Sequence, residues 1–301
     1  MKSIENKIKK IISKNFEISE KSLNILYIEH SILDRNHVYI FNIKNKNYII
    51  KISFSLENWT NETKVLDILK KYSFVPQVIF KEKESEFNYV IMESIDGTAA
   101  IKKIKNFDKK TKDIFIYNLG LNLAKIHSFK EFNFYGSWEE YGEKNLIKHR
   151  KNKDINMINR IEKNSLRHNK IIKEGLNILE SERNKLLNFK PKLTHKDFSL
   201  RNILADKTGK ITGVLDYEHS EPEDPSLDIC SIFHSDLLDE KHNFQIFKEG
   251  YEEILEFPYN FLNNKKYYLA NTGIYLCGRF SSENTDIHSR GLTLIKKSIN
   301  L

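Results

Sequence analysis

Four polar side chains in the second half of the chain have the types and the spacing that phosphoryl transfer requires. His195, Asp197 and Asn202 follow the pattern H-x-D-x-x-x-x-N, and the carboxylate of Asp216 ends the next apolar run. A phosphoryl group is transferred mainly through positioning and charge neutralisation, with one carboxylate at the acceptor hydroxyl and a metal at the phosphates. Mg²⁺ prefers oxygen ligands, including one or two protein carboxylates. The pattern therefore indicates that Asp197 faces the hydroxyl, whereas Asn202 and Asp216 hold the metal.

A β-hairpin would bring these groups together. Turn-forming residues at 206–209 separate two apolar runs, which is typical of two paired strands. If Ala205 pairs with Lys210, then Asp216 lies opposite Ser199, beside the loop that carries the motif. We therefore expect two carboxylates and one amide to converge at one end of one hairpin.

The segment with the sequence HKDFSLRNILAD, continued by GKITGVLDYEHSEPEDPSLDI, resembles the catalytic block of the aminoglycoside phosphotransferase and choline kinase-like family. In that family an H-G-D-x-x-x-x-N loop supplies the catalytic Asp and a metal-binding Asn, and a following I-D-W/F-E element supplies the second metal ligand. The resemblance implies these roles for Asp197, Asn202 and Asp216. Two residues, Lys196 and Glu223, stand where the family pattern has Gly.

The resemblance also implies an α+β, bilobal protein-kinase-like fold, with an antiparallel β-sheet N-lobe and a mainly helical C-lobe. We expect residues 1–93 to form the nucleotide-binding lobe, residues 94–98 the hinge, and residues 99–301 the helical lobe with the catalytic loop and the acceptor site. The apolar patterns agree with five strands and one helix before the hinge. The segments expected to be strands are 23–28, 38–43, 48–54, 78–80 and 89–92.

A lysine on the third predicted strand has a candidate role in holding phosphates. Lys51 lies between isoleucines, where a lysine is usually just exposed to solvent, but kinase-like folds use a lysine on the third strand to bind the α- and β-phosphates. Its partner would be a glutamate on the next helix. We favour Glu62 over Glu57, because Glu62 begins the helical apolar pattern.

The expected nucleotide site includes a loop that covers the phosphates and a hinge that contacts the purine. Kinases cover the phosphates with a glycine-rich loop, but residues 29–37 contain no glycine. We expect the side chain of Ser31 or Asn36 to donate in place of backbone groups. The resemblance implies that backbone groups near the end of the last strand bind the purine, and these belong to Met92, Glu93 and Ile95.

Acidic residues near the motif bear on the identity of the acceptor. Glu218, Glu221 and Asp236 belong to an acid-rich stretch in a chain of net charge +8. Acids beside a metal site would attract a polycationic alcohol such as an aminoglycoside. The alternative for Asp224 and Asp228 is stabilisation of a helix N-terminus, and Asp228 could also brace the catalytic loop.

Two further residues allow more than one interpretation. Lys196 could lower the pKa of Asp197, orient a phosphate, brace the loop or simply point to solvent. His127 closes a long apolar helix expected over residues 107–127, where a structural role is more common than a catalytic one. Residues 138–188 are helical in pattern and polar, and we expect them to belong to the acceptor side.

Composition narrows the class of protein. With 301 residues, 40% of them hydrophobic, the chain can form two lobes with sizeable cores. It has no apolar run near the ~20 residues that span a bilayer and no secretory signal, so we expect a cytoplasmic protein that does not bind a membrane. Lysines are spread over the whole length, which argues against nucleic acid as a partner. Two isolated cysteines, Cys230 and Cys277, form neither a zinc site nor a disulfide framework. We expect the protein to be a monomer.

These observations predict a small-molecule O-phosphotransferase. It would use Mg²⁺ to move the γ-phosphate of ATP or GTP to a hydroxyl of an aminoglycoside-type antibiotic, and the string D-F-x-x-x-N with G-x-I-T-x-V-x-D resembles hygromycin kinases. Choline, homoserine, methylthioribose and macrolides stay open as acceptors. A catalytically dead kinase-like binding module is the alternative that the glycine-free loop favours.

Overall fold

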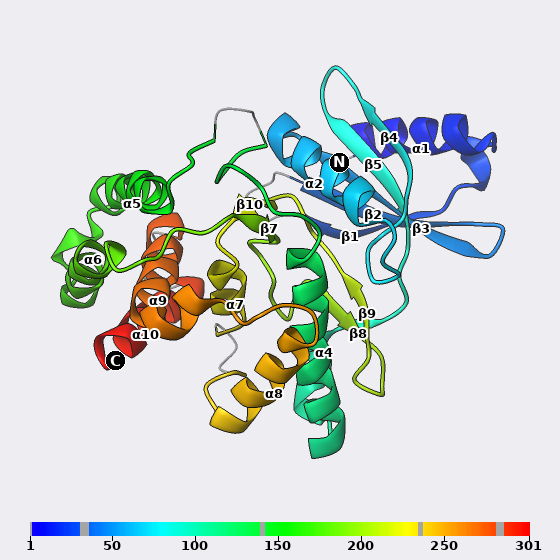
Figure 1. Cartoon of the computed structure of the whole chain (residues 1–301). Coiled ribbons are helices and arrows are strands. Elements are labelled where there is room, and N and C mark those ends of the chain that lie inside the picture. The colour runs from blue at the N-terminus through cyan, green and yellow to red at the C-terminus, as the bar shows by residue number, and fades with distance from the viewer. Residues whose placement is uncertain (1, 31–35, 139–141, 234–236, 281–285) are drawn as a thin grey trace. The chain divides into compact units, whose positions relative to one another are not determined.

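The computed structural model divides the chain into two compact units (Figure 1). Unit 1 is Met1–Gly97 together with Thr212–His219, and unit 2 is Thr98–Ile211 together with Ser220–Leu301. The residues that the structure describes are 2–30, 36–138, 142–233, 237–280 and 286–301.

Unit 1 contains a five-stranded antiparallel sheet in the order β1-β2-β3-β5-β4. In its central register, Val38 of β2 and Val90 of β5 flank Lys51 of β3. The elements of this unit are α1 (Lys2–Phe16), the 3₁₀ turn η1 (Glu20–Ser22), β1 (Ile25–His30), β2 (Asn36–Ile43), β3 (Lys46–Ser53), α2 (Leu56–Leu69), β4 (Val78–Lys83) and β5 (Asn88–Glu93).

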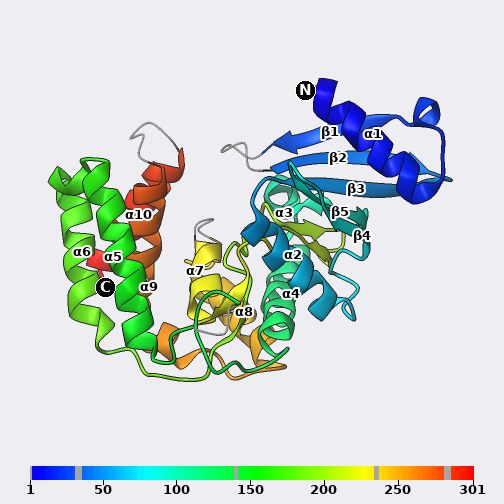
Figure 2. The same cartoon turned by 90° about the horizontal axis from the view of Figure 1, so that it is seen from above.

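One face of the sheet forms the core of unit 1. Side chains alternate between the faces of a strand, so Ile50 and Ile52 point to one side of β3 and Lys51 to the other. The isoleucine side packs against α1, where Ile8 and Ile12 lie one turn apart. Figure 2 shows α1 lying along the sheet. Helix α1 therefore covers the face of the sheet that carries Ile50 and Ile52.

The opposite face, which carries Lys51, is apolar but only partly covered. Ile40 of β2 and Ile49 of β3 share this face one register step from Lys51, and both are partly exposed. Leu26 of the edge strand β1 pairs with Ile40 and exposes 60% of its surface. This face thus presents an ammonium group beside a strip of accessible aliphatic side chains.

Unit 2 is mainly helical. Helices α5, α6, α9 and α10 lie side by side in Figure 2, and α4 packs against α8. Its elements are β6 (Thr98–Ala99), α3 (Ala100–Lys103), η2 (Ile104–Asn106), α4 (Lys109–His127), α5 (Leu146–Lys163), η3 (Leu166–His168), α6 (Lys170–Arg183), β7 (Lys192–Thr194), β8 (Ile203–Ala205), β10 (Glu221–Glu223), α7 (Ser226–Phe233), α8 (Lys241–Glu252), α9 (Tyr259–Arg279) and α10 (Asp286–Ile299), while β9 (Ile211–Val214) continues into unit 1.

Side-chain caps set where the main helices of unit 2 begin. The carboxylate of Asp108 accepts a hydrogen bond from the backbone N–H of Thr111, at 2.7 Å, and so starts α4. Asn145 and Asn169 cap α5 and α6 in the same way. Such caps satisfy backbone donors that have no partner inside the helix. Among the residues that the structure describes, every helix is too short or too polar to cross a bilayer.

The hairpin between β8 and β9 differs from the expected register by one residue. The backbone N–H of Asp206, rather than that of Ala205, bonds to the carbonyl of Lys210, at 3.0 Å. The turn therefore holds three residues, 207–209, where four were expected, and its last residue, Gly209, has a left-handed φ of 81°. The expected Ala205–Lys210 pair is therefore wrong, and with it the placement of Asp216 opposite Ser199.

Residues 212–219 were expected in the helical lobe, but they belong to unit 1. The N–H of Val214 bonds to the carbonyl of Phe74, at 2.8 Å, which ties the end of β9 to the segment after α2. The strand β10 was not expected, because the sequence Glu-Pro-Glu lacks the alternation of a strand. Its partner is β7, with Glu221 opposite Thr194.

The packing of α4 against α8 depends on two glycines. A Cβ atom added to Gly120 would lie 2.0 Å from the carbonyl oxygen of Phe247, and one added to Gly250 would lie 2.1 Å from that of Tyr117. We expect Gly120→Ala or Gly250→Ala to lower the free energy of unfolding by at least ~2 kcal/mol, because the helices must separate. Urea unfolding of purified protein measures this loss.

Gly278→Ala in α9 is the matched control, because its added Cβ would find its nearest neighbour at an ordinary 3.4 Å. We expect this variant to unfold like the wild type. If Gly120→Ala and Gly250→Ala also unfold like the wild type, then the close approach of α4 and α8 does not hold.

Candidate functional site

Lys51 is surrounded by three carboxylates of unit 1. Its Nζ atom lies 2.8 Å from Oε2 of Glu62, 2.6 Å from Oδ1 of Asp216 and 3.2 Å from Oε2 of Glu218. Lys51 and Glu62 are buried. The structure thus pairs Lys51 with Glu62, the glutamate favoured from the sequence, and adds the two acids that follow β9.

Local structure explains why these side chains meet. Ser55 caps α2 by accepting a hydrogen bond from the N–H of Asn58, which places Glu62 in the second turn of the helix. Asp216 follows β9 and has a left-handed φ of 67°, a conformation that Asp tolerates better than most residues. Each acid is therefore directed by the end of a regular element.

The charges of this cluster do not balance, since one ammonium faces three carboxylates. Burial alone would lower the pKa of Lys51, but the carboxylates of Asp216, Glu62 and Glu218 raise it well above 10.5. Burial raises the pKa of Glu62 from 4.5 to about 7, with Asp216 adding to the effect and Lys51 opposing it. Lys51 therefore stays charged, and Glu62 is partly protonated near neutral pH.

An acid that binds a cationic acceptor would be exposed to solvent, and Glu218 is not. It is buried, and its Oε2 accepts a hydrogen bond from Nδ2 of Asn36. Asn36, one candidate for covering the phosphates, is thus bonded to an acid, and its buried Oδ1 has no hydrogen-bond partner among the described residues. Ser31, the other candidate, lies outside the described residues.

The cluster has the chemistry of a cation site. Glu62, Asp216 and Glu218 offer carboxylate oxygens that all lie within 4.8 Å of one another. Several carboxylate oxygens converging on one point suit a hard divalent cation such as Mg²⁺. The set includes Asp216, one of the two expected ligands, but Nζ of Lys51 already lies within 3.2 Å of all three carboxylates, so an ammonium group occupies this cluster and the Mg²⁺ site stays a prediction.

In unit 2, the loop that carries Asp197 is held by the carboxylate of Asp228. The backbone N–H of His195 bonds to its Oδ2 at 2.7 Å, and that of Lys196 bonds to its Oδ1 at 2.6 Å. Nε2 of His127 lies 3.0 Å from the same carboxylate, and Nδ1 of His127 lies 2.8 Å from the hydroxyl of Tyr251. His127 is buried, and its contacts are those of a structural residue. Asp228 thus braces the loop.

The motif residues Asp197 and Asn202 lie at the two ends of a short turn. Nδ2 of Asn202 donates to the carbonyl of Asp197 at 3.0 Å, and its backbone N–H donates to the carbonyl of Ser199 at 2.9 Å. Because the amide nitrogen is used in this way, Oδ1 is the atom of Asn202 suited to a cation. Asp197 and Asn202 belong to unit 2 and Asp216 to unit 1, so their convergence stays a prediction.

Backbone groups at the end of β5 are partly used within the sheet. The N–H of Glu93 donates to the carbonyl of Gln77, and that of Ser94 donates to the carbonyl of Asn47, each at 3.0 Å. Met92 is paired on both sides. Of the residues expected to bind a purine, Ile95 alone follows the end of the sheet.

The acids expected to bind the acceptor have lysine partners where they are described. Oε1 of Glu221 accepts from Nζ of Lys196 and lies 3.3 Å from Nζ of Lys153, and Glu218 is the third acid of the Lys51 cluster. Asp236 lies outside the described residues. The assignment of these three acids to the acceptor stays a prediction.

Sequence reasoning missed the polar face of α5. Oε2 of Glu223 contacts Nε2 of His149, at 2.7 Å, and the guanidinium of Arg150. Burial alone would raise the pKa of Glu223, but Arg150 and His149 hold it well below 4.5. The available signal was that His149 and Arg150, together with Asp154, fall at the helical spacing of the buried apolar residues of α5.

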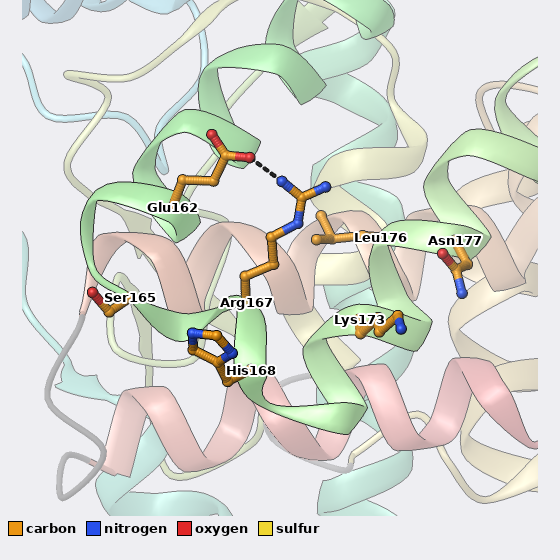
Figure 3. A pocket seen from close by; sticks show the side chains of 7 residues that line it. All are labelled: Glu162, Ser165, Arg167, His168, Lys173, Leu176 and Asn177. Atoms are coloured by element: carbon orange, nitrogen blue, oxygen red, sulfur yellow. Dashed lines mark hydrogen bonds and ion pairs between the residues drawn. The ribbon is translucent and has the colours of Figure 1, made fainter.

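A pocket of about 470 Å³ opens between α5, η3 and α6 (Figure 3). Its cationic side chains include Arg167, which forms an ion pair with Glu162. None of the lining residues belongs to the loop of Asp197, to β10 or to unit 1, so the pocket lies outside the candidate site. The lining residues are Glu162, Ser165, Arg167, His168, Lys173, Leu176 and Asn177.

Comparisons with known proteins give one matching family and many similar folds. The model described as "Phosphotransferase enzyme family" matches residues 34–252, which is more than half of the chain. No curated protein matches the chain. Among solved structures, aminoglycoside phosphotransferase APH(4)-Ia has 13% identical residues and a TM-score of 0.70, with 97% of each chain covered.

Two ligand complexes are also similar to the chain. A thermostable mutant of APH(4)-Ia with AMP-PNP and hygromycin B has 13% identity and a TM-score of 0.71, with 97% of this chain and 98% of that chain covered. The gentamicin complex of APH(2″)-IIa has 18% identity and a TM-score of 0.62, with 97% and 95% covered. At these identities the likeness extends to the fold alone, and it confirms the bilobal protein-kinase-like fold expected from the sequence.

Glu62 makes the stability of the ligand-free protein depend on pH. Folding raises its pKa from 4.5 to about 7, so between these values the folded protein binds more protons than the unfolded chain. The free energy of unfolding therefore falls as pH rises through this window. At about 1.4 kcal/mol per pKa unit, this contribution is on the order of 3 kcal/mol, and we expect Glu62→Gln to remove most of it.

Urea unfolding between about pH 5 and about pH 8 measures the effect. Glu57→Gln is the matched control, because Glu57 lies exposed in the first turn of the same helix. We expect the control to keep the wild-type pH dependence. An identical dependence in Glu62→Gln and the wild type would show that Glu62 does not hold the proton.

Proposed function

Because the chain belongs to the phosphotransferase enzyme family, we propose that it moves the γ-phosphoryl group of a nucleoside triphosphate to a hydroxyl of an aminoglycoside-type molecule. The enzyme class expected from the sequence, a phosphotransferase with an alcohol group as acceptor, is confirmed at the level of the family. The observation that carries the proposal is the contact of Lys51 with both Glu62 and Asp216, at 2.8 and 2.6 Å. Kinase-like phosphoryl transfer requires a lysine, a helix glutamate and a metal-binding aspartate of this kind.

The face of the sheet that carries Lys51 supports nucleotide binding. An ammonium group suits the α- and β-phosphates, and the partly exposed side chains of Ile40 and Ile49 offer apolar contact to a base. The similar structure with AMP-PNP supports a nucleotide donor. In this proposal the nucleotide lies along β2 and β3, with its phosphates toward Lys51.

Mg²⁺, when bound, would neutralise charge on the phosphates. Asn202 and Asp216 are the proposed ligands, and Glu218 lies close enough to Asp216 to contribute an oxygen. The protonated fraction of Glu62 allows the cluster to compensate for a change in local charge, since a bound cation favours the ionised carboxylate. The residues thus bind and balance charge without doing covalent chemistry.

Asp197 is the proposed partner of the acceptor hydroxyl. Its loop is fixed at two backbone N–H groups by Asp228, so its carboxylate starts from a defined backbone position. A carboxylate there would orient the hydroxyl and accept its proton as the phosphoryl group is transferred.

An aminoglycoside is the acceptor class that the similar structures support, because hygromycin B and gentamicin occupy two of them. In this chain a cationic acceptor would have to compete with Lys196 and Lys153 for Glu221, since both lysines already contact its Oε1 atom. Asp236 stays a proposed acceptor ligand. The second candidate, a binding module without turnover, is favoured by the absence of glycine from residues 29–37.

We expect Asp197→Asn to lower kcat by ~10²–10⁴-fold while nucleotide binding persists, because the base and orienting group is lost but the phosphate contacts remain. Steady-state kinetics and nucleotide titration measure the two effects separately. Asp206→Asn is the control, because Asp206 serves the turn between β8 and β9. Wild-type turnover in Asp197→Asn would remove Asp197 from its proposed role.

A panel of acceptors tests the substrate class. We expect Mg²⁺-dependent consumption of ATP or GTP to rise well above the rate without acceptor when aminoglycosides are added. Choline, homoserine, methylthioribose and a macrolide are the comparison acceptors. Turnover with one of these alone would move the assignment to that class, and intact nucleotide binding without any turnover would support the binding module.

A further inference from the structure

We propose that Lys196 is a positioning residue for Asp197, acting through an ion pair with Glu221 that connects the catalytic loop to α5. The proposal rests on the proposed role of Asp197. Lys196 has a left-handed φ of 65° directly before Asp197. Glycine adopts this conformation without a steric penalty, whereas a lysine needs compensating contacts to hold it.

The backbone and the side chain of Lys196 both have such contacts. Its N–H bonds to Oδ1 of Asp228 at 2.6 Å, which fixes the peptide before it. Its Nζ bonds to Oε1 of Glu221, and both side chains are largely buried. An ion pair that is largely removed from water is screened less than a surface pair, so it can hold the strained conformation.

Glu221 is itself held in place by β7. It pairs with Thr194, and the hydroxyl of Thr194 donates to the backbone carbonyl of Glu221 at 2.8 Å. Thr194 precedes the motif loop by one residue. The lysine side chain therefore returns to the strand pair from which its own loop emerges, and this closes the loop into a small bonded ring.

The strand β10, which carries Glu221, is attached to α5. Lys153 lies 3.3 Å from the oxygen of Glu221 that Lys196 contacts, and Glu223 binds His149 and Arg150. The side chain of Lys153 is 40% exposed and that of Lys196 is 25% exposed. Lys196 is the nearer and more buried partner, so it is the lysine that transmits the position of β10 to the loop.

The function of this connection is to fix the direction in which Asp197 points. The N–H of Asp197 lies 3.3 Å from Nδ1 of His195, so a rotation of the 196–197 peptide would disturb this contact. The carbonyl of Asp197, which belongs to the next peptide, accepts from Nδ2 of Asn202 and fixes the other side of the residue. Small errors in the position of a catalytic group lower kcat strongly, even when binding is unchanged. Lys196 thus holds, by an ion pair, the left-handed backbone conformation that a glycine would adopt without strain.

Three substitutions of Lys196 test the proposal by steady-state kinetics. We expect Lys196→Met to lower kcat about 10-fold to 100-fold with an unchanged KM for the nucleotide, because it keeps the strained backbone but removes the ion pair. Lys196→Arg retains the charge and should restore kcat. Lys196→Gly should fall between them, because it removes the strain together with the ion pair.

Substitutions at the partners distinguish positioning from general stability. Glu221→Gln should match Lys196→Met, and the double variant should be no worse than either single one, because both changes break one contact. Lys153→Met is the matched control and should keep a near wild-type kcat. Circular dichroism and nucleotide titration establish that each variant is folded and binds.

Two results would overturn the proposal. One is a wild-type kcat in Lys196→Met, and the other is a kcat in Lys196→Gly that equals or exceeds the wild-type value. If Asp197→Asn retains full turnover, then the proposed role of Asp197 fails instead. Loss of turnover in Asp197→Asn with an unaffected Lys196→Met removes the positioning role alone.

Discussion

The carboxylate of Asp228 is the contact on which the order of the loop that carries Asp197 depends. It is fully buried and accepts two backbone N–H groups from His195 and Lys196, besides contacting His127. The bond from His195 is buried and that from Lys196 is partly buried, so the loss of the carboxylate would leave at least the His195 donor unsatisfied. One side chain thereby joins the ends of α4 and α7 to the loop, and Tyr251 adds α8 through the imidazole of His127.

Charge in this protein is organised locally rather than by the overall balance of +8. In unit 1 the acids outnumber Lys51, and a proton on Glu62 relieves the excess. In unit 2 the basic residues of α5 meet the two acids of β10. Lysines elsewhere lie mainly on solvated helix faces, so the net charge describes the surface and not the site.

The features that could be predicted from the sequence are those that depend on residues close together in the chain. The strands of unit 1, the turn at 206–209 and the choice of Glu62 over Glu57 follow from periodicity and spacing, and the structure agrees with them. The expected register of the hairpin was wrong because Asp206 pairs with Lys210, which leaves three residues in the turn where four were expected. The contact between Arg150 and Glu223 joins residues that are far apart in the chain, and no local pattern indicates such a pairing.

The exposed edge of the sheet at β1 favours aggregation of the protein. Leu26 and Ile28 are each more than half exposed on a strand that, among the described residues, has a partner strand on one side only. Unpaired backbone groups flanked by aliphatic side chains act as a template for strands of other molecules. Aggregation during refolding or concentration would therefore start at this edge sooner than at the lysine-rich helices.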